Sequence, residues 1–501
     1  MDNPKISYNQ ILGLLSQNGL LGEYKLKELE AEVGFISHDS REIEKNTLFF
    51  SKHSHFKEQK LADALQKGAV CYLSEQKYDF KADYIITSDI RRAIALIAPL
   101  YYGYPYESLN LVGITGTKGK TTVAYFLKNI FDEHTKSKTG LISSIETYTG
   151  KRGEESHNST PEPRDLQQFF YEAKQSKINF FTMEVTSQAY KLDRVHNIKF
   201  QNGIFLNIAE DHISPAEHDS FEDYLGCKLK FLENCSNIVI NCETDCFDRA
   251  LAAAKSSATL KQIVLFGSEK SKNFCDYYYS EIKKEKEGLS FCIKNDKTGY
   301  FAKFAIKTPG LFNVENAAAA VAMCKTLDID DIDIRAGLLK TQIPGRMNVF
   351  ENGGVTVIVD YAHNLLSFTK LYESIKFDYP NQRIISVGGA PGEKAYRRRK
   401  DFADVVGKNS DYVYLTAEDP QFEDVEAICA EIAGHMPNTN YEIISDRGEA
   451  VKKAIKSAKP GDVVALLAKG GENYQKVKGE YEFYESDLEI AKNILFNGGK
   501  K

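Results

Sequence analysis

The sequence predicts an α/β protein with three domains. Apolar runs typical of strands alternate with helical stretches along most of the chain, an order typical of mostly parallel sheets covered by helices. With 501 residues, the chain is also too long for a single hydrophobic core. Two breaks, at residues 101–105 and 343–346, contain proline and glycine and interrupt the alternation. We therefore expect domains over residues 1–108, 109–345 and 346–501.

The first domain is expected to be a small α/β unit. Its predicted strands are rich in aromatic and aliphatic residues and cover residues 46–50, 70–73 and 84–87. Its predicted helices begin at Leu12 and cover residues 62–69 and 90–101. The stretch 101–105 reads as the linker that follows.

The central domain begins with a glycine-rich turn between a predicted strand, residues 109–114, and a predicted helix, residues 123–131. Such a turn directs backbone N–H groups and the positive end of the helix dipole at an anion. Its Gly-Lys-Thr sequence predicts a triphosphate site, where Lys120 reaches the β- and γ-phosphates and the Thr121 hydroxyl meets Mg²⁺. Gly113 lies six residues before Gly119, one more than in the general phosphate-loop motif. We conclude that the chain binds a nucleoside triphosphate.

Two further strands are predicted to end beside this loop, because ligands bind at the carboxyl ends of parallel strands. The first, residues 180–185, ends near Glu184, and the second, residues 203–208, precedes His212. A lone carboxylate at the end of an apolar strand is costly unless it is paired or metal-bound. The helix predicted over residues 221–232 carries Lys228 and Lys230, for which a solvated lysine is the plainer interpretation from the residues alone.

The rest of the chain continues the α/β pattern. Residues 268–307 are predicted to form a small antiparallel excursion, and a helix over residues 313–324 places Asn313 and Asn316 on one face. The third domain is predicted to contain strands over residues 355–360, 383–389, 412–416 and 462–467, each followed by a helix.

Composition excludes several classes of protein. A formal charge of −6 argues against a general nucleic-acid binder, and no apolar run is long enough to span a membrane. The N-terminus lacks the apolar core of a signal peptide. The nine cysteines form no metal-binding pattern, so reduced, mostly buried thiols are expected. We expect a cytoplasmic monomer that binds neither nucleic acid nor membrane.

Several motifs in one order resemble the Mur ligases, ATP-dependent amino-acid ligases that build the peptidoglycan stem peptide. They are Gly116-Thr117-Lys118-Gly119-Lys120-Thr121, Met183-Glu184-Val185, Asp211-His212, Pro344-Gly345-Arg346 and Asp360-Tyr361-Ala362-His363. The resemblance implies a small UDP-binding α/β domain, a central P-loop ATPase with a mostly parallel, doubly wound sheet, and a Rossmann-like domain for the amino acid. The chain looks most like the members that add the third residue to UDP-N-acetylmuramoyl-L-alanyl-D-glutamate through an acyl phosphate.

The resemblance also implies roles for individual residues. Catalysis is assigned to Lys120, Glu184, His212 and Lys228. Mg²⁺ would be bound by Thr121, Glu184, His212 and Lys228, the last as a carbamate, with Lys230 as the alternative. ATP contacts are assigned to Gly116, Thr117, Lys118, Gly119, Lys120, Thr121, Thr122, Asn316, Arg346 and Asp360. Contacts to the UDP-muramoyl-dipeptide are assigned to Ser40, Ser159, Thr160, Ser187 and Arg194.

The incoming amino acid is predicted from one departure from the family pattern. Diaminopimelate-adding members carry Asp-Asn-Pro-Arg where this chain has Glu418-Asp419-Pro420-Gln421. Without that arginine a second carboxylate has no partner, whereas a side-chain ammonium suits an acidic end formed by Glu418, Asp419 and Glu472. Either Arg398 or Arg399 would bind the α-carboxylate. We therefore expect L-lysine, with ornithine or diaminopimelate as alternatives.

Two other functions remain open from the sequence. A folylpolyglutamate synthetase-like ligase would share the ATPase but would not need the N-terminal domain, residues 1–108. A non-catalytic nucleotide-binding regulator would not need intact Lys120, Glu184, His212 and Lys228.

Overall fold

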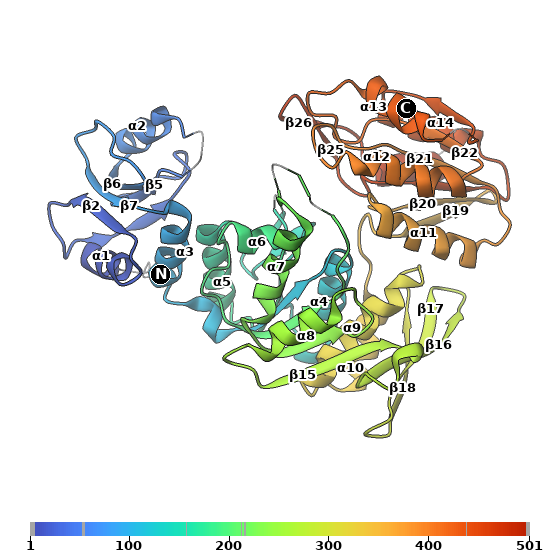
Figure 1. Cartoon of the computed structure of the whole chain (residues 1–501), viewed down its shortest axis with the longest axis horizontal. Helices are drawn as coiled ribbons and strands as arrows, with labels where there is room; N and C mark the ends of the chain where they lie inside the picture. Colours follow the sequence, from blue (N-terminus) through green and yellow to red (C-terminus); the bar gives the residue numbers. More distant parts are fainter. Residues whose placement is uncertain are drawn as a thin grey trace.

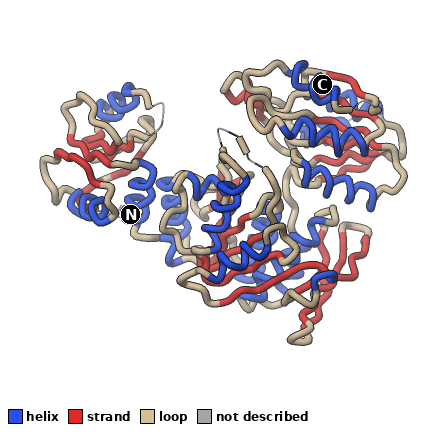
Figure 2. Tube along the Cα trace, viewed as in Figure 1, coloured by secondary structure: helices blue, strands red, loops and turns tan. Residues whose placement is uncertain are grey.

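The chain folds into three lobes of strands flanked by helices (Figure 1, Figure 2). The computed structural model describes residues 6–52, 56–156, 158–211, 213–214, 217–436 and 438–496. The first lobe (blue) lies beside the central one, and the third (orange to red) lies above the other side of the central lobe (Figure 1).

The N-terminal lobe contains a five-stranded sheet in the order β2-β7-β6-β5-β4. Strands β4 to β7 are parallel and β2 is antiparallel to β7. The strands are β2 (Leu21–Lys25), β4 (Phe35–Ser37), β5 (Thr47–Phe50), β6 (Ala69–Ser74) and β7 (Asp83–Thr87), with a separate pair β1 (Ile6–Ser7) and β3 (Glu32–Val33). The helices are α1 (Tyr8–Gln17), α2 (Glu58–Gln66) and α3 (Ile90–Tyr102). A capping box at Ser7 begins α1, and Gly103, with φ of 68°, ends α3.

The central lobe is built on an 11-stranded sheet in the order β11-β10-β9-β12-β8-β13-β14-β15-β16-β17-β18. Strands from β9 to β16 in this order are parallel, and both ends of the sheet are antiparallel. The bounds are β8 (Asn110–Thr115), β9 (Gly140–Ile142), β10 (Glu146–Tyr148), β11 (Gly153–Glu155), β12 (Phe180–Glu184), β13 (Phe200–Phe205), β14 (Cys235–Asn241), β15 (Gln262–Ser268), β16 (Tyr277–Lys284), β17 (Leu289–Asn295) and β18 (Tyr300–Ile306). Because β12 and β13 lie on either side of β8, the chain changes direction at β8, which places a binding crevice at its carboxyl end.

Helices cover both faces of the central sheet. One apolar core joins the sheet to α4 (Lys120–Thr135), α9 (Phe312–Thr326) and α10 (Asp331–Lys340). A second core joins the other face to α5 (Pro163–Gln175), α6 (Ser187–Lys191), α7 (Phe221–Leu232) and α8 (Phe247–Lys255). Short 3₁₀ turns, η1 (Pro105–Ser108) and η2 (Glu269–Ser271), lie at the start and at the side of this lobe. The sheet is therefore doubly wound, as predicted.

The C-terminal lobe contains a six-stranded sheet in the order β19-β20-β24-β21-β22-β23 that is parallel except at β19. Its strands are β19 (Asn348–Asn352), β20 (Val355–Val359), β21 (Ile384–Gly388), β22 (Tyr412–Leu415), β23 (Tyr441–Ile443) and β24 (Val463–Leu466). Helices α11 (Leu365–Asp378), α12 (Arg397–Phe402) and α13 (Val425–Gly434) pack on one face, with a π-helical turn η3 (Ala403–Gly407) after α12. Helices α14 (Arg447–Ser457) and α15 (Asp487–Phe496) pack on the other. A hairpin, β25 (Tyr474–Val477) and β26 (Glu480–Phe483), extends beyond the sheet.

The structure confirms the predicted α/β class and most predicted elements, including the helix over residues 221–232 and the antiparallel excursion. Three details were wrong. The strand predicted over residues 203–208 lies at 200–205, Ala69 begins a strand, and α3 continues to Tyr102 into the predicted linker. The hairpin β25–β26 was missed, since its residues are polar and lack an apolar run.

The described residues agree with two expectations from composition. None of the nine cysteines forms a disulfide, and seven of them are buried. Across the described part of the chain, every helix is too short or too polar to cross a membrane.

Candidate active site between the central and C-terminal lobes

A cavity of about 330 Å³ lies where the carboxyl end of β8 faces the C-terminal lobe. Its wall combines residues that are far apart in the sequence but were predicted to act together. The lining includes Thr117, Lys118, Gly119, Lys120, Thr121, Thr122, Ser159, Glu184, Asn316, Arg346, Asp360, His363, Arg398, Glu418 and Asp419. Most of the predicted ATP residues and part of the predicted amino-acid pocket thus share one cavity.

The phosphate loop has the strand–turn–helix geometry that the sequence predicts. Gly119 caps α4 with φ of 89°, a backbone conformation that favours glycine, and a Cβ there would lie 2.3 Å from Asn316 Oδ1 and displace that side chain. Lys120 Nζ donates to the carbonyls of Gly116 (2.8 Å) and Thr117 (3.2 Å). Burial lowers the pKa of Lys120 below its ordinary value. An anion at the loop would therefore stabilise the charged form of this lysine.

Glu184 and Thr121 lie together at the end of β12. The buried Glu184 carboxylate accepts hydrogen bonds from Thr121 Oγ1 at 2.8 Å and from the Ser144 backbone N–H at 2.7 Å. A hydroxyl and a carboxylate oxygen are the ligands that Mg²⁺ prefers, so this donor set fits the predicted ion. The third predicted ligand, His212, lies outside the described residues.

Lys228 points into the protein from α7, whereas Lys230 is exposed. Lys228 is 2% exposed, and its Nζ donates to the carbonyl of Gly116 at 2.9 Å. Burial lowers its pKa well below the ordinary value, and the nearby Lys120 lowers it further. The solvated-helix interpretation therefore does not hold for Lys228, and of the two lysines it is the one beside the phosphate loop.

Asp211 connects the central lobe to the C-terminal lobe. Its carboxylate accepts from Arg398 Nη2 at 2.9 Å and Asn364 Nδ2 at 2.6 Å, and it lies 3.6 Å from Lys118 Nζ. Lys118 Nζ also lies 2.9 Å from His363 Nε2, and burial lowers the pKa of Lys118 to about 7. These contacts place Arg398 against the phosphate loop. Asp211 had no predicted role, although it directly precedes the predicted ligand His212.

The structure separates Arg398 from Arg399. Arg398 lines the cavity, and its Nε is a buried donor without a partner among the described residues. Arg399 instead pairs with Glu423 Oε2 at 2.7 Å and with Glu431, and its side chain is 5% exposed. Arg399 is thus held away from the cavity by two carboxylates, and of the two arginines predicted as alternatives Arg398 is the one that lines it.

The predicted acidic end of the amino-acid pocket also needs correction. Lys469, 1% exposed, lies between two of its three acids, with Nζ 2.9 Å from Asp419 Oδ1 and 2.6 Å from Glu472 Oε2. A lysine of the chain itself therefore already neutralises Asp419 and Glu472. Lys469 was visible in the sequence beside Glu472, but nothing in the pattern indicated that it turns back on both acids.

Glu418 is the remaining acid. It is buried and lines the cavity, and no hydrogen bond or ion pair reaches its carboxylate from the described residues. Burial raises its pKa to about 7, against the opposing effect of Arg398. Gln421 does not line the cavity. Its backbone lies beside the hairpin, where its N–H donates to the carbonyl of Lys476 and its C=O accepts from the N–H of Lys478.

Asn316, Arg346 and Asp360 line the cavity from three elements. Asn316 Nδ2 donates to Asn313 Oδ1 at 3.0 Å, and the Arg346 guanidinium stacks on the Tyr361 ring at 4.2 Å. Asp360 accepts from the backbone N–H groups of Met347 and Ala362 at 2.7 and 2.8 Å, which fixes the loop after β20.

The residues predicted to hold the UDP-muramoyl-dipeptide fall into two groups. Thr160 Oγ1 donates to the Glu184 carbonyl at 3.0 Å, and Arg194 Nη1 donates to the Thr160 carbonyl at 3.1 Å. Ser159 lines the cavity, and the buried Ser187 lies at the start of α6. Ser40 does not line the cavity and lies in the N-terminal lobe, where its carbonyl accepts from Lys67 Nζ at 2.9 Å. An ion pair between Lys52 of the N-terminal lobe and Glu162 of the central lobe connects these two lobes.

Comparison with known proteins identifies the family. Residues 114–324 match the Mur ligase middle domain, and residues 345–470 match the Mur ligase glutamate ligase domain. A UDP-N-acetylmuramoyl-L-alanyl-D-glutamate–L-lysine ligase of Enterococcus faecalis is 38% identical over 474 residues, covering 93% of this chain and 92% of that protein. The chain belongs to the Mur ligase family. A ligase with the same name from Streptococcus agalactiae is 38% identical over 465 residues, covering 92% of each chain.

Solved structures agree on the fold of this Mur ligase. A UDP-N-acetylmuramoyl-L-alanyl-D-glutamate–2,6-diaminopimelate ligase superposes with a TM-score of 0.65 at 21% identity, covering 99% of this chain and 100% of that one. MurF from Acinetobacter baumannii superposes with a TM-score of 0.67 at 17% identity, covering 95% and 97%. At these identities the likeness concerns the fold alone.

The position of Lys120 generates a first prediction. Lys120→Ala should raise the barrier for ATP turnover by about 3 kcal/mol or more, about a hundredfold in rate, because a buried cation facing the phosphates is lost. Steady-state phosphate release measures the effect. Lys138→Ala, which removes an exposed lysine just after α4, is the control and should leave turnover unchanged. Near-normal turnover of Lys120→Ala would contradict the phosphate-loop assignment.

Proposed function

We propose that this Mur ligase joins L-lysine to the D-glutamate of UDP-N-acetylmuramoyl-L-alanyl-D-glutamate in an ATP-dependent step of peptidoglycan precursor synthesis. The observation that carries the proposal is the shared cavity, in which Lys120 and Thr121 of the phosphate loop face Arg398 and Glu418 of the C-terminal lobe. The relatives from Enterococcus faecalis and Streptococcus agalactiae, 38% identical over more than nine-tenths of the chain, are named as lysine ligases.

The alternatives have less support. A folylpolyglutamate synthase of Mycobacterium tuberculosis superposes with a TM-score of 0.61 at 14% identity, which concerns the fold alone. A non-catalytic regulator would have no need for the buried Glu184 and Lys228 beside the phosphate loop, since each buried charge or amine is costly to keep. Ornithine and diaminopimelate remain as competing amino acids for the experiment below.

The three lobes suggest a division of labour. We assign the UDP moiety to residues 1–108, ATP and the dipeptide carboxylate to residues 109–345, and the amino acid to residues 346–501.

The chemistry follows from the charges around the cavity. A carboxylate oxygen of the D-glutamate attacks the γ-phosphorus of ATP, the bond to the bridging oxygen breaks, and ADP leaves. Both reactants are anions, so their approach needs fixed positive charge, which Lys120, Lys118 and the loop N–H groups supply. The α-amine of lysine then attacks the acyl carbon, and the tetrahedral intermediate loses phosphate and a proton.

Thr121 and Glu184 are the described residues that would hold Mg²⁺. When bound, the ion would neutralise charge on the phosphates and on the developing acyl phosphate. Ser144 would keep Glu184 in place, because its backbone N–H donates to the same carboxylate oxygen that accepts from Thr121.

Lys228 is suited to carbamate formation. Burial lowers the pKa of its amine well below the ordinary value and so favours the neutral form, which can attack the carbon of CO₂. A nitrogen–carbon bond forms, a proton leaves the nitrogen, and the product carries two anionic oxygens beside the phosphate loop. The modification would turn a buried amine into an oxygen ligand of the kind that Mg²⁺ prefers.

The amino-acid pocket has one group for each end of lysine. Arg398 offers its unpartnered Nε to the α-carboxylate. Glu418 faces the same cavity and would take the side-chain ammonium, while Lys469 neutralises Asp419 and Glu472. A second carboxylate at this end would face Glu418, where like charges in contact cost several kcal/mol, and Lys394 on the same cavity wall would offset part of that cost.

An amino-acid panel tests the proposed function. With ATP and UDP-N-acetylmuramoyl-L-alanyl-D-glutamate, lysine should give phosphate release and a product of the matching mass. The kcat/KM for lysine should exceed that for diaminopimelate about a hundredfold, since an unpaired carboxylate at Glu418 costs about 3 kcal/mol. Equal or better use of diaminopimelate would defeat the lysine assignment, and no amino-acid-dependent phosphate release would defeat the ligase proposal.

A second test concerns Lys228. Lys228→Ala should lose nearly all activity and recover part of it with added acetate or formate, because the missing group is a metal-binding carboxylate-like anion. Lys230→Ala is the control, because it removes the exposed lysine two residues further along the same helix. Its rate should stay within about twofold of that of the unmutated enzyme, as is usual for surface substitutions. Full activity of Lys228→Ala would rule out the carbamate.

The pKa of Glu418 gives a pH-dependent prediction. Because this pKa is about 7 in the free chain, lowering the pH through 7 protonates Glu418 and removes the charge that attracts the lysine ammonium. The ratio of kcat/KM for lysine to that for norleucine should therefore fall as the pH falls from about 8 to about 6, which is about the range of one titration. The ratio cancels the shared titration of the α-amine. It should be flat with pH in Glu418→Gln, and a flat ratio in the unmutated enzyme would exclude Glu418 as the ammonium partner.

A further inference from the structure

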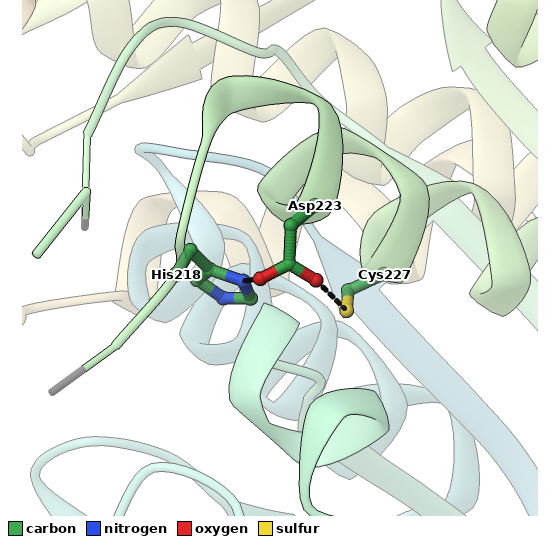
Figure 3. A group of neighbouring side chains, drawn as sticks. All are labelled: His218, Asp223 and Cys227. Carbon is green, nitrogen blue, oxygen red and sulfur yellow. Dashed lines mark hydrogen bonds and ion pairs between the residues drawn. The ribbon is translucent and has the colours of Figure 1, made fainter. Parts of the chain in front are cut away.

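Polar side chains also cluster outside the residues assigned to catalysis. His218, Asp223 and Cys227, before and along α7, place their ligand atoms within 4.8 Å of one another (Figure 3). The carboxylate of this cluster already has a cation of the chain, because Lys191 Nζ lies 2.7 Å from Asp223 Oδ2. None of these four residues lines the cavity. A buried ion pair in the C-terminal lobe has a closer connection to the amino-acid pocket.

That ion pair joins Arg447, the first residue of α14, to Asp487, the first residue of α15. Arg447 Nε lies 2.9 Å from Asp487 Oδ1 and Nη2 lies 2.5 Å from Oδ2, and both side chains are fully buried. Taking two charges out of water is costly, so a buried ion pair often adds no more stability than apolar residues of the same size. Net stability is therefore a weak explanation for this pair.

The same guanidinium connects the two loops that carry the amino-acid pocket. Its Nη1 donates to the carbonyl of Ala417, after β22, at 3.0 Å, and its Nη2 donates to the carbonyl of Leu467, after β24, at 2.6 Å. Strand β21 lies between β22 and β24 in the sheet, so these contacts span the end of β21. The planar fork of arginine supplies donors in fixed directions to both carbonyls and to the carboxylate, which a lysine ammonium does not.

Glu418 directly follows the first of these carbonyls. Its own carbonyl accepts from Gln475 Nε2 at 2.9 Å, so the backbone is held both before and at Glu418. Burial lowers the pKa of Arg447, but Asp487 chiefly, and Glu418 to a smaller extent, raise it above its ordinary value. The attraction is mutual, and a nearby cation favours the charged form of a buried carboxyl. Arg447 thus acts on both the place and the charge of Glu418.

Lys469 follows the second carbonyl after one intervening residue, Ala468. The φ of Ala468 is 79°, a conformation that is unfavourable for a residue with a Cβ and persists only where surrounding contacts hold it. The hydrogen bond from Arg447 holds the peptide group just before this turn. Beyond the turn, Lys469 reaches Asp419 at 2.9 Å and Glu472 at 2.6 Å.

We propose that Arg447, held by Asp487, is a positioning residue for selection of the amino-acid side chain. It fixes Glu418 as the partner of the side-chain ammonium and Lys469 as the cation that neutralises the other two acids. The inference rests on the proposed function. A misplacement of about 1 Å in a binding group costs up to about a hundredfold in rate, so loops freed from Arg447 would recognise an ammonium poorly. An apolar side chain of the same length would lose less.

The combination of Arg447→Met with Asp487→Leu tests the inference, because it removes the pair without leaving one buried charge alone. The ratio of kcat/KM for lysine to that for norleucine should fall about tenfold, and the KM for ATP should stay within about twofold. The ratio cancels the fraction of folded enzyme, so a loss of stability alone does not change it. An unchanged ratio would overturn the inference.

Arg447→Lys is the conservative variant, and it keeps the test open if the combined variant folds poorly. Lysine retains the positive charge beside Asp487 but lacks the fork that reaches both carbonyls. The lysine-to-norleucine ratio should fall about threefold or more. The ratio of the unmutated enzyme in this variant would show that the fork has no part in selection, against the proposal.

Arg383→Met is the matched control. Arg383 Nη1 lies 3.0 Å from Asp462 Oδ2, and these residues precede β21 and β24, at the end of the sheet away from the cavity. The variant removes an ion pair from the same sheet and should leave the ratio unchanged. A fall as large as that of the Arg447 variants would indicate general loosening of the lobe, and the inference would be wrong.

A Glu418→Gln background tests whether Arg447 acts through Glu418. In that background, Arg447→Met with Asp487→Leu should lower the ratio no further, because effects that share one contact are not additive. A further tenfold fall, about as large as in the unmutated background, would place the effect elsewhere and contradict the inference. Equal use of lysine and norleucine by the unmutated enzyme would instead contradict the proposed selection of lysine, and the inference with it.

Discussion

Three lysines crowd around the turn that begins at Gly116, and the burial of their amines constrains the rest of the site. Lys118, Lys120 and Lys228 all have lowered pKa values, chiefly through burial, and the charge of one disfavours the charge of the next. Lys120 and Lys228 even share one acceptor, the carbonyl of Gly116. A site of this kind is stabilised by anions. A bound triphosphate would supply them, in place of carboxylates of the chain itself.

Asp211 is a carboxylate that partly meets this need, and it also joins two lobes. It receives Arg398 and Asn364 from the C-terminal lobe and lies near Lys118 of the phosphate loop. Arg398, the proposed partner of the amino acid's α-carboxylate, and Lys118 of the phosphate loop therefore share one carboxylate, that of Asp211. A triphosphate at Lys118, or an α-carboxylate at Arg398, would therefore change the charge that Asp211 meets.

Lys469 of the chain itself lowers the net negative charge at the end of the cavity proposed to bind the amino acid. Lys469 is almost fully buried between Asp419 and Glu472, and these carboxylates outweigh the effect of burial and raise its pKa. Glu418 is left as an acid whose own pKa is raised to about 7. Among the three acids predicted for this end, Glu418 is thus the one that no described lysine or arginine pairs with, in place of the strongly acidic wall that the sequence indicated. In the proposed function, discrimination between diamino acids would depend on Glu418 and on the shape held by the loops. Arg447 supports that shape, because it donates to the carbonyls of Ala417 and Leu467 while paired with the buried Asp487.

The sequence by itself determined the α/β class, the phosphate loop and most elements, because these depend on local signals. Apolar runs define β8 and β12, the N-cap Ser220 and the acids after it begin α7, and glycine alone tolerates the turn at Gly119. Even the convergence of Glu184 with Thr121 followed from the rule that parallel strands end at one edge. Only the tertiary structure decided which of two neighbouring side chains faces the site, with Arg398 lining the cavity and Lys228 buried beside the phosphate loop. In each pair the two side chains are chemically identical, so the sequence cannot tell them apart. The orientation of α12 distinguishes Arg398 from Arg399, and that of α7 distinguishes Lys228 from Lys230. The pairing of Lys469 with Asp419, 50 residues apart, likewise depends on how β22 and β24 bring their following loops together, and no periodicity in the chain encodes that distance.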